Sequence, residues 1–298
     1  MSDRTDMHDL PTNSNAPRRS ASVTHLLSIE GISVRFAGVK ALTNVSFQVL
    51  PGELFAVIGP NGAGKTSLFN VLSRVYQPVA GKVTFAGRDL LRLRTHQVAR
   101  VGIARTFQNL GQFPNTTVLD YLLLGRHTRM RSGILLGGIY LGMTRNEERR
   151  NRAHCLHLLE LLGMERMRDA PLGSLPYGLQ KRADLARALA LEPKLLLLDE
   201  PAAGMSLEET EDIASAILEI KEQLNVTQIL VEHDMALVMG IADHVLVLDF
   251  GRVIAQGSPA EVQANPDVIK AYLGEDFSNK QLQDEVAADA LMPADDRH

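Results

Sequence analysis

Residues 59–66 read GPNGAGKT, so glycines, a lysine and a threonine stand at a fixed spacing. This pattern, G-x-x-x-x-G-K-[ST], is typical of a loop that binds phosphate groups. Its glycines permit a tight turn in which successive backbone N–H groups face one anion, and the N-terminus of a following helix adds partial positive charge. We expect Lys65 to contact the β- and γ-phosphates of a nucleotide and assist catalysis, and Thr66 to offer its hydroxyl to Mg²⁺. The nucleotide contacts predicted in this loop are Gly59, Asn61, Gly62, Ala63, Gly64, Lys65, Thr66 and Ser67.

A second group of reactive side chains follows an apolar run. Residues 195–198 are all leucine and lead into Asp199, Glu200 and Pro201. An acid at the carboxyl end of a buried parallel strand lies in the crevice where such sheets bind ligands. We therefore predict that Asp199 holds Mg²⁺ and that Glu200 polarises an attacking water. The same letters alone also fit a strand that ends in solvated acids before a proline.

Three further features are candidate parts of the same phosphate site when they occur together with these two groups. Gln108 follows a short strand, and His233 follows the apolar residues 229–231. Residues 175–180 read LPYGLQ and open a helix, whose first N–H groups form a second anion site. A lone histidine is more often packed or solvated, and the LPYGLQ stretch alone also fits an ordinary loop–helix junction.

The elements that must position these residues begin with strands. Pro51 and Gly52 mark a turn, which predicts that residues 47–49 and 54–58 pair as an antiparallel hairpin. Residues 194–198 and 228–232 are expected to be buried parallel strands because they are mainly apolar. The other expected strands are residues 27–36, 83–85, 103–107 and a hairpin of 245–248 with 252–255.

Helix starts are marked by a serine or threonine with an acid three residues later. Such capping boxes stand at Thr117, Thr144 and Ser206. One predicted helix starts at Thr117 and runs through residue 124. The others span residues 144 to about 162, 180–191 and 206 to about 224. We therefore expect an α/β core that a helical insertion interrupts at about residues 109–182.

Size and composition fit one globular domain of residues 26–276 between two disordered tails, 1–25 and 277–298. The chain has 298 residues, a hydrophobic fraction of 45% and a formal net charge of −4, which argues against a nucleic-acid-binding surface. No apolar run reaches the roughly 18–20 residues of a membrane span. Cys155 is the single cysteine, and we expect it to be a small buried hydrophobe in a cytosolic protein.

The order of these pieces resembles the nucleotide-binding subunits of ABC transporters over about residues 26–275. The resemblance implies a P-loop NTPase core, with a mixed sheet, flanking helices and an antiparallel β subdomain, plus the inserted α-helical subdomain. It implies that two ATPase subunits, identical or different, dimerise head to tail. Each ATP then lies between the phosphate loop of one subunit and the LSGGQ-type signature of the other.

The resemblance also implies the remaining partners and the place of action. The cofactors are ATP and Mg²⁺, and nucleic acid is not a partner. Two transmembrane permease subunits bind the ATPases at the inner face of the cell membrane, on the cytoplasmic side. A periplasmic or extracellular solute-binding protein acts indirectly.

Several residues take roles by matching the family's motifs. Phe36 lies where the family's adenine-stacking aromatic lies, and a core strand residue is an equal alternative. Gln108 resembles the loop glutamine that touches Mg²⁺ and reports to the membrane subunits. Glu200 resembles the catalytic base and His233 the switch histidine. The implied metal ligands are Thr66, Gln108 and Asp199, and the implied signature contacts to the partner's nucleotide are Tyr177, Gly178 and Gln180.

Two departures from the family pattern concern the dimer contacts. Pro176 replaces the usual signature serine, which removes a hydroxyl worth roughly 1.5–3 kcal/mol if nothing compensates for it. Residues 202–206 read AAGMS where SALD is commoner. Together with EHDM at 232–235 and the stretch 265–274, both departures resemble the ATPase subunits of branched-chain amino acid importers. We therefore expect an active enzyme of an importer.

Other functions fit parts of the sequence. The ending YLGEDF at 272–277 is similar to the ATPase of lipopolysaccharide export, and urea or amide import is a further alternative. A soluble, non-transport ABC ATPase would usually carry two fused nucleotide domains or long coiled coils, neither of which the sequence predicts. Asp249-Phe-Gly251 copies a kinase tripeptide, but no kinase catalytic loop accompanies it.

Overall fold

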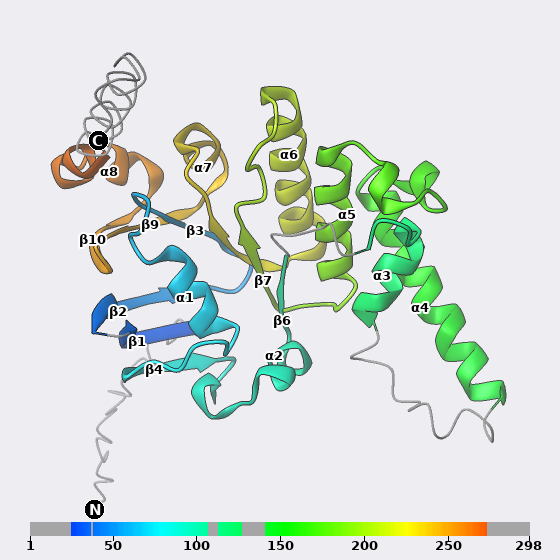
Figure 1. The fold of residues 1–298 in the computed structure, drawn as a ribbon, viewed down its shortest axis with the longest axis horizontal. Coiled ribbons are helices and arrows are strands. Elements are labelled where there is room, and N and C mark those ends of the chain that lie inside the picture. The colour runs from blue at the N-terminus through cyan, green and yellow to red at the C-terminus, as the bar shows by residue number, and fades with distance from the viewer. Residues whose placement is uncertain (1–24, 37, 107–112, 127–140, 273–298) are drawn as a thin grey trace, which may run out of the picture.

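The computed structural model describes residues 25–36, 38–106, 113–126 and 141–272, and gives side chains in the last range from residue 146 onward. Two β-sheets organise this part of the chain, and helices cover the larger of them (Figure 1). One further group of helices lies to the side, beyond the edge strand of the larger sheet (Figure 1). This is the α/β architecture, with an antiparallel β subdomain and a helical region, that the sequence predicts.

The larger sheet has the strand order β10-β9-β3-β8-β7-β6. All neighbours are parallel except β9 and β10, so the sheet is mixed. Every residue of β3, β7 and β8 is buried, which is typical of parallel strands covered on both faces. The strands are β3 (Leu54–Ile58), β6 (Ile103–Arg105), β7 (Leu195–Asp199), β8 (Thr227–Val231), β9 (His244–Asp249) and β10 (Arg252–Gly257).

The smaller sheet is antiparallel and has the order β2-β1-β4-β5. Buried and more exposed residues alternate along much of β1 and β2, as expected for strands with one covered face. Its strands are β1 (Leu27–Phe36), β2 (Val39–Val49), β4 (Ala80–Phe85) and β5 (Arg88–Asp89).

Two hydrophobic cores cover opposite faces of the larger sheet. Helix α1 (Lys65–Leu72) shares one core with both sheets through Leu68 and Phe69. Helices α5 (Tyr177–Leu189), α6 (Leu207–Leu224) and α7 (Met235–Ile241) contribute to the other core (Figure 1). Helices α1 and α5 therefore lie on opposite faces of the same sheet.

The lateral group consists of α3 (Val118–Arg126) and α4 (Leu141–Leu161), which pack against each other and against α5. Cys155 is buried there, and burial raises the pKa of its thiol to about 11, which confirms the predicted buried hydrophobe. The remaining short helices are α2 (Thr95–Val101), α8 (Pro259–Gln263) and the 3-10 turns Leu90–Arg92, Glu165–Met167 and Leu172–Ser174.

One predicted strand pairing is wrong. Residues 47–49 and 54–58 do not form a hairpin across Pro51 and Gly52. The first segment ends β2, which pairs with β1 in the small sheet, and the second is β3, which pairs with β8 and β9 in the large sheet. The turn therefore passes the chain from one sheet to the other.

The predicted capping box at Ser206 is confirmed, the predicted cap at Thr117 makes one of its two expected bonds, and two helix starts are displaced. Thr117 Oγ1 accepts a hydrogen bond from the backbone N–H of Asp120 at 3.1 Å, and Ser206 caps α6 together with Glu209. Helix α4 begins at Leu141, three residues before the predicted start, and α5 begins at Tyr177 rather than at residue 180. The predictions contained no helix at α2, α7 or α8.

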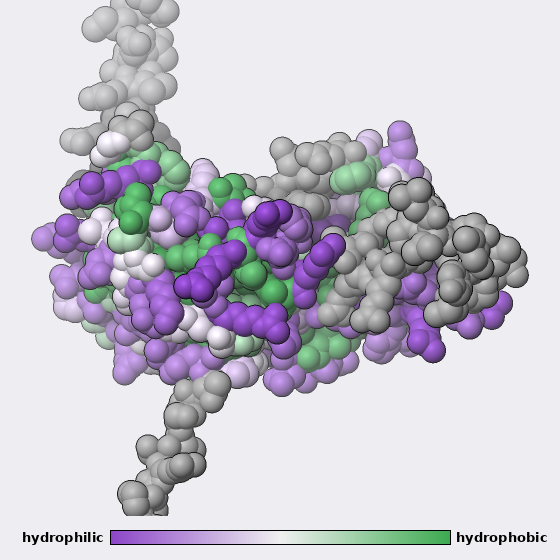
Figure 2. Space-filling view, turned by 90° about the horizontal axis from the view of Figure 1, so that it is seen from below, coloured by the Kyte–Doolittle hydropathy of each residue, from purple (hydrophilic) through white to green (hydrophobic). Residues whose placement is uncertain are grey.

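The face that Figure 2 shows is mainly hydrophilic where it is described. In Figure 2, hydrophobic residues near the centre of the visible face are interspersed with hydrophilic ones. Within the described ranges, no helix combines the length and the apolar character needed to cross a membrane.

Candidate nucleotide-binding site

The loop of residues 59–66 connects β3 to α1, as the sequence predicts. Gly59 has a φ of +146°, and a Cβ there would lie 2.0 Å from the carbonyl oxygen of Leu248 in β9. Gly64 has a φ of +104°, and a Cβ there would lie 2.6 Å from the carbonyl oxygen of Ala41 in β2. Both positions require glycine, because the loop runs directly against the backbone of two neighbouring strands.

Some residues of this loop are buried, and others are exposed to solvent. Lys65 is buried, and its ammonium donates to the carbonyl oxygens of Gly59 at 2.5 Å and Pro60 at 3.0 Å. Its charge is thus held at the loop itself. The backbone N–H of Gly251, in the turn between β9 and β10, donates to the carbonyl of Ala63 at 3.0 Å and so connects this turn to the loop. The exposed members of the loop are Asn61, Gly62 and Thr66.

Asp199 ends β7 with its carboxylate fully buried. Its Oδ2 forms an ion pair with Nη2 of Arg105 at 2.6 Å, and its backbone N–H donates to Oγ1 of Thr106 at 3.2 Å. The Arg105 guanidinium also donates to Oδ1 of Asn70 in α1 at 2.9 Å. Arg105 therefore connects β6 and β7 to the helix that follows the phosphate loop.

The other oxygen of Asp199 fits a role at a bound metal ion. Oδ1 is buried and has no hydrogen-bond partner among the residues that the structure describes. A buried polar atom without a partner is costly, and a hard cation or its water shell would satisfy it. Among the described residues, no group of three His, Cys, Asp or Glu side chains forms a metal cluster.

Glu200 and His233 lie just beyond the ends of neighbouring strands. Asp199 pairs with Val231 in the parallel ladder of β7 and β8, and the backbone N–H of Glu200 donates to the carbonyl of Val231 at 2.9 Å. Glu200 adopts a left-handed backbone conformation with a φ of +48°, where the chain turns away from the strand. The His233 side chain is exposed. The two residues are therefore held at the same edge of the sheet.

The sequence predictions missed Glu232, which lies between Val231 and His233. Its carboxylate is buried and accepts hydrogen bonds from the backbone N–H groups of Ala202 at 2.8 Å and His233 at 3.1 Å. Burial raises the pKa of Glu232, and the hydrogen bonds from the backbone act against this shift. A charged residue directly after the apolar residues 229–231 was the available signal, because such a residue must find a partner when it is buried.

The predicted signature residues form the first turn of α5. Pro176 is the N-cap and accepts a hydrogen bond at its carbonyl from the backbone N–H of Gln180 at 3.0 Å. The Gln180 side chain donates to the carbonyl of Leu175 at 2.8 Å. Tyr177 is exposed, and the backbone N–H of Gly178 donates to Oε1 of Glu209 at 3.3 Å. A carboxylate of α6 thus contacts the amide end of this helix, which favours negative charge.

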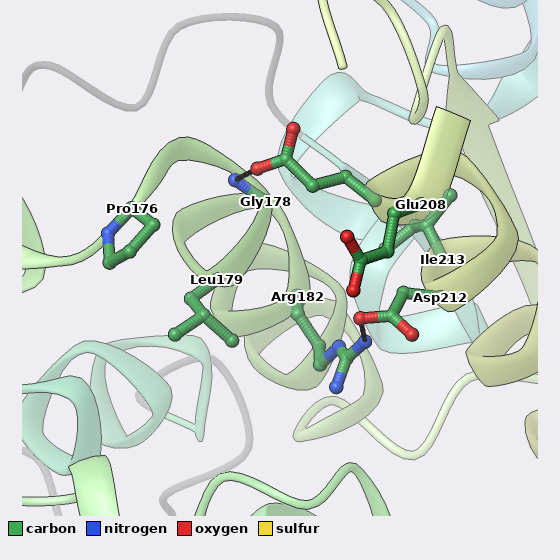
Figure 3. Close-up of a pocket in the computed structure, with 8 residues that line it drawn as sticks. Pro176, Gly178, Leu179, Arg182, Glu208, Asp212 and Ile213 are labelled. Atoms are coloured by element: carbon green, nitrogen blue, oxygen red, sulfur yellow. Dashed lines mark hydrogen bonds and ion pairs between the residues drawn. The ribbon is translucent and has the colours of Figure 1, made fainter. Parts of the chain in front are cut away.

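A cavity of about 290 Å³ lies between the starts of α5 and α6 (Figure 3). Arg182 of α5 and Asp212 of α6 form an ion pair of 3.1 Å at this cavity. Its lining residues are Pro176, Gly178, Leu179, Arg182, Glu208, Glu209, Asp212 and Ile213. The turn at Pro176 and Gly178 is therefore open to a ligand or a partner chain on one side.

Two site predictions remain, those for Phe36 and Gln108. Phe36 ends β1 with 40% of its surface exposed, and its ring lies edge-on to Tyr76 with centroids 4.5 Å apart. It is therefore not a fully buried core residue, and its role in adenine stacking stays a prediction. Gln108 lies outside the described residues.

The predicted residues divide into two groups. The phosphate loop, Asp199, Glu200 and His233 gather at the carboxyl edge of β3, β7 and β8. The signature turn belongs to α5 and contacts α6, on the face of the sheet opposite α1. Within one chain, the signature therefore belongs to a different layer from the phosphate loop.

Comparisons with known proteins agree with this geometry. The family model described as "ABC transporter" matches residues 42–203, and the model "Branched-chain amino acid ATP-binding cassette transporter" matches residues 252–278. The high-affinity branched-chain amino acid transport ATP-binding protein BraF of Pseudomonas aeruginosa is 40% identical over 84% of this chain and 98% of its own length. LivG of Escherichia coli K12, which carries the same description, is 39% identical over the same shares.

Solved structures give the same relationship. A nucleotide-free ATP-binding cassette from an ABC transporter matches with a TM-score of 0.74 and 30% identity, over 84% of this chain and 99% of that one. The ADP conformation of an ATP-binding cassette matches with a TM-score of 0.74 and 31% identity, over 85% and 100%.

Proposed function

Because the chain belongs to the ATP-binding subunits of ABC transporters, which couple ATP hydrolysis to transport, we propose that it powers the import of branched-chain amino acids. The substrate class rests on one observation: 40% identity extends over 98% of a relative described as a branched-chain amino acid transport protein. We also propose that residues 26–276 form the nucleotide-binding domain and that the protein acts at the cytoplasmic face of the membrane.

The chemistry assigned to this chain is the positioning of ATP and of one water molecule. Backbone N–H groups of the loop 59–66 and the Lys65 ammonium bind the phosphates and offset their charge. Thr66 and Asp199 would hold Mg²⁺, with Gln108 as a third contact, and the ion would neutralise charge on the phosphate oxygens. Glu200 orients and polarises the attacking water, and His233 faces the γ-phosphate from the neighbouring strand end.

The second half of the site comes from another ATPase subunit. We propose that this chain, as an ABC transporter subunit, dimerises with a second ATPase subunit and works with permease subunits. We place the Tyr177, Gly178 and Gln180 turn of one subunit on the nucleotide of the other, because within one chain α5 and α1 lie on opposite faces of the sheet. The proposed partners are two permeases and, indirectly, a solute-binding protein.

Glu200→Gln tests the catalytic assignment. We expect the variant to bind ATP with an affinity within about twofold of wild type and to hydrolyse it at least about a hundredfold more slowly, since a positioned general base contributes about 10²–10⁴-fold. Glu222→Gln, a change of an exposed acid near the end of α6, is the control and should leave turnover unchanged. Normal turnover of Glu200→Gln contradicts the assignment.

Transport in reconstituted vesicles tests the substrate class. The protein is purified with its permeases and solute-binding protein, and ATP-dependent uptake of labelled leucine is measured. Uptake that stops with Glu200→Gln supports the proposal. Sulfate is the alternative substrate to test, because a sulfate/thiosulfate import ATP-binding protein of Bordetella parapertussis is 33% identical over 84% of this chain. Uptake of sulfate, or of urea, without uptake of leucine contradicts it.

A further inference from the structure

Glu232 connects the two loops that carry Glu200 and His233. Its side chain is 1% exposed, so both carboxylate oxygens are removed from bulk water. Oε1 accepts the backbone N–H of Ala202, two residues after Glu200, at 2.8 Å. Oε2 accepts the backbone N–H of His233 at 3.1 Å. One carboxylate thus bridges the chain after β7 and the chain after β8.

This bridge begins where the backbone ladder ends. The last rung between the two strands joins Asp199 to Val231, and the N–H of Glu200 adds one bond to the carbonyl of Val231. Beyond that point both chains turn away, and Glu200 has a positive φ. The Glu232 side chain therefore replaces the missing rung and fixes the spacing of the two loops.

Only a carboxylate suits this position. Ionised glutamate offers acceptors on both oxygens, whereas glutamine presents an NH₂ group in place of one of them. In Glu232→Gln, that NH₂ would face a backbone N–H, and one buried donor would lose its acceptor. The buried charge is offset by hydrogen bonds from backbone N–H groups, which are strong when the acceptor is ionised.

We propose that Glu232 is a positioning residue for hydrolysis: it fixes the loop after Glu200 relative to the backbone of His233. This inference rests on the proposed roles of Glu200 and His233. Glu232 does not touch the nucleotide in this scheme. It sets the distance between the group that polarises water and the group that faces the γ-phosphate, and small misplacements of such groups are costly in rate.

The test compares two buried glutamates at opposite edges of the same sheet. Glu53, 8% exposed, accepts the backbone N–H of Leu50 and pairs with His244 at the amino end of β3. Glu232→Gln and Glu53→Gln are each measured for thermal stability, affinity for a fluorescent ATP analogue, KM and kcat. We expect kcat of Glu232→Gln to fall by about tenfold to a hundredfold with KM and nucleotide affinity within about twofold of wild type. We expect Glu53→Gln to lose stability and keep its kcat.

Glu232→Asp covers the case in which the glutamine variant does not fold. It keeps the charge but withdraws the carboxylate from Ala202 by one methylene, so kcat should again fall while nucleotide binding persists. A folded Glu232→Gln or Glu232→Asp with wild-type kcat overturns the inference, as does an equal loss of kcat in Glu53→Gln. Glu200→Gln in the same assay separates the two failures: if it turns over normally, the proposed catalytic site is wrong. If only the Glu232 variants do so, only this inference is wrong.

Discussion

The ion pair of Arg105 and Asp199 joins residues with very different access to water. The Asp199 carboxylate is fully buried, whereas the Arg105 side chain is 23% exposed. Arg105 also donates to Asn70 at 2.9 Å, and its guanidinium lies 5.7 Å from the Phe69 ring centroid. Removal of the arginine would leave Oδ2 of Asp199 buried without this partner, beside an Oδ1 that has no partner within the described part of the chain.

Arg105→Gln should therefore lower the free energy of unfolding by about 3 kcal/mol, the cost of breaking a buried ion pair from one side. The matched control is Arg182→Gln. The Arg182 side chain is 19% exposed, but its partner Asp212 is 66% exposed and can be solvated, so we expect a loss of about 1 kcal/mol. Urea denaturation of both variants measures the difference. Equal losses would contradict the view that the burial of Asp199 sets the cost.

At the scale of residues, a functional role could be predicted from the sequence where the residue belongs to a short motif. Lys65 and Thr66 belong to one short motif, and Asp199 and Glu200 follow one apolar run. The roles of Arg105 and Glu232 depend on contacts with Asp199 and Ala202, which are 94 and 30 residues away. Their roles depend on which strands become neighbours, and single-sequence patterns do not specify that.

The start of α6 shows how a helix cap can also serve a neighbouring helix. Ser206 and Glu209 form the predicted capping box, and Glu209 additionally accepts the backbone N–H of Gly178 in α5. The hydrogen bonds from Ser206, and then that from Gly178, hold the pKa of Glu209 below its ordinary value of 4.5. A lowered pKa means that the ionised carboxylate favours the folded state.

Glu209 should therefore stabilise the protein above about pH 4.5, and its contribution should vanish as the pH falls through the lowered pKa of the folded state. We expect Glu209→Gln to melt at a lower temperature than wild type at pH 7, and the gap to close on acidification below pH 4.5. Melting curves over this range measure it. Glu222→Gln, an exposed change near the end of α6, should show no such gap; a gap independent of pH for Glu209→Gln would contradict the assignment.

The wrong hairpin across Pro51 and Gly52 also belongs to the scale of elements. A turn signal is local, and it does not say whether the flanking strands pair with each other. The two segments nevertheless differ: the end of β2 alternates between buried and exposed, whereas all residues of β3 are buried. A continuous apolar run is typical of a central parallel strand, so this contrast was a signal that the two belong to different sheets.

At the scale of the whole molecule, the two parts of the proposed site, the phosphate loop and the signature turn, lie apart. The phosphate loop leads into α1, which packs in the core shared with both sheets, and the signature turn belongs to α5 on the opposite face of the larger sheet. The order of motifs predicted this fold class because each motif has its own strand or helix. The extent of the lateral helical group was less predictable, because α4 begins before its capping signal.

Two copies of the chain should therefore associate through bound ATP, and the complex should persist when hydrolysis is blocked. We expect Glu200→Gln with ATP and Mg²⁺ to sediment at twice the mass of the same variant without nucleotide. Adding Lys65→Ala to this variant should abolish the dimer, because that lysine's charge offsets the charge of the phosphates. Specific ATPase activity of the wild-type chain should rise with protein concentration for the same reason. A chain that hydrolyses ATP at one constant specific rate while it sediments as a monomer would show that its own residues complete the site.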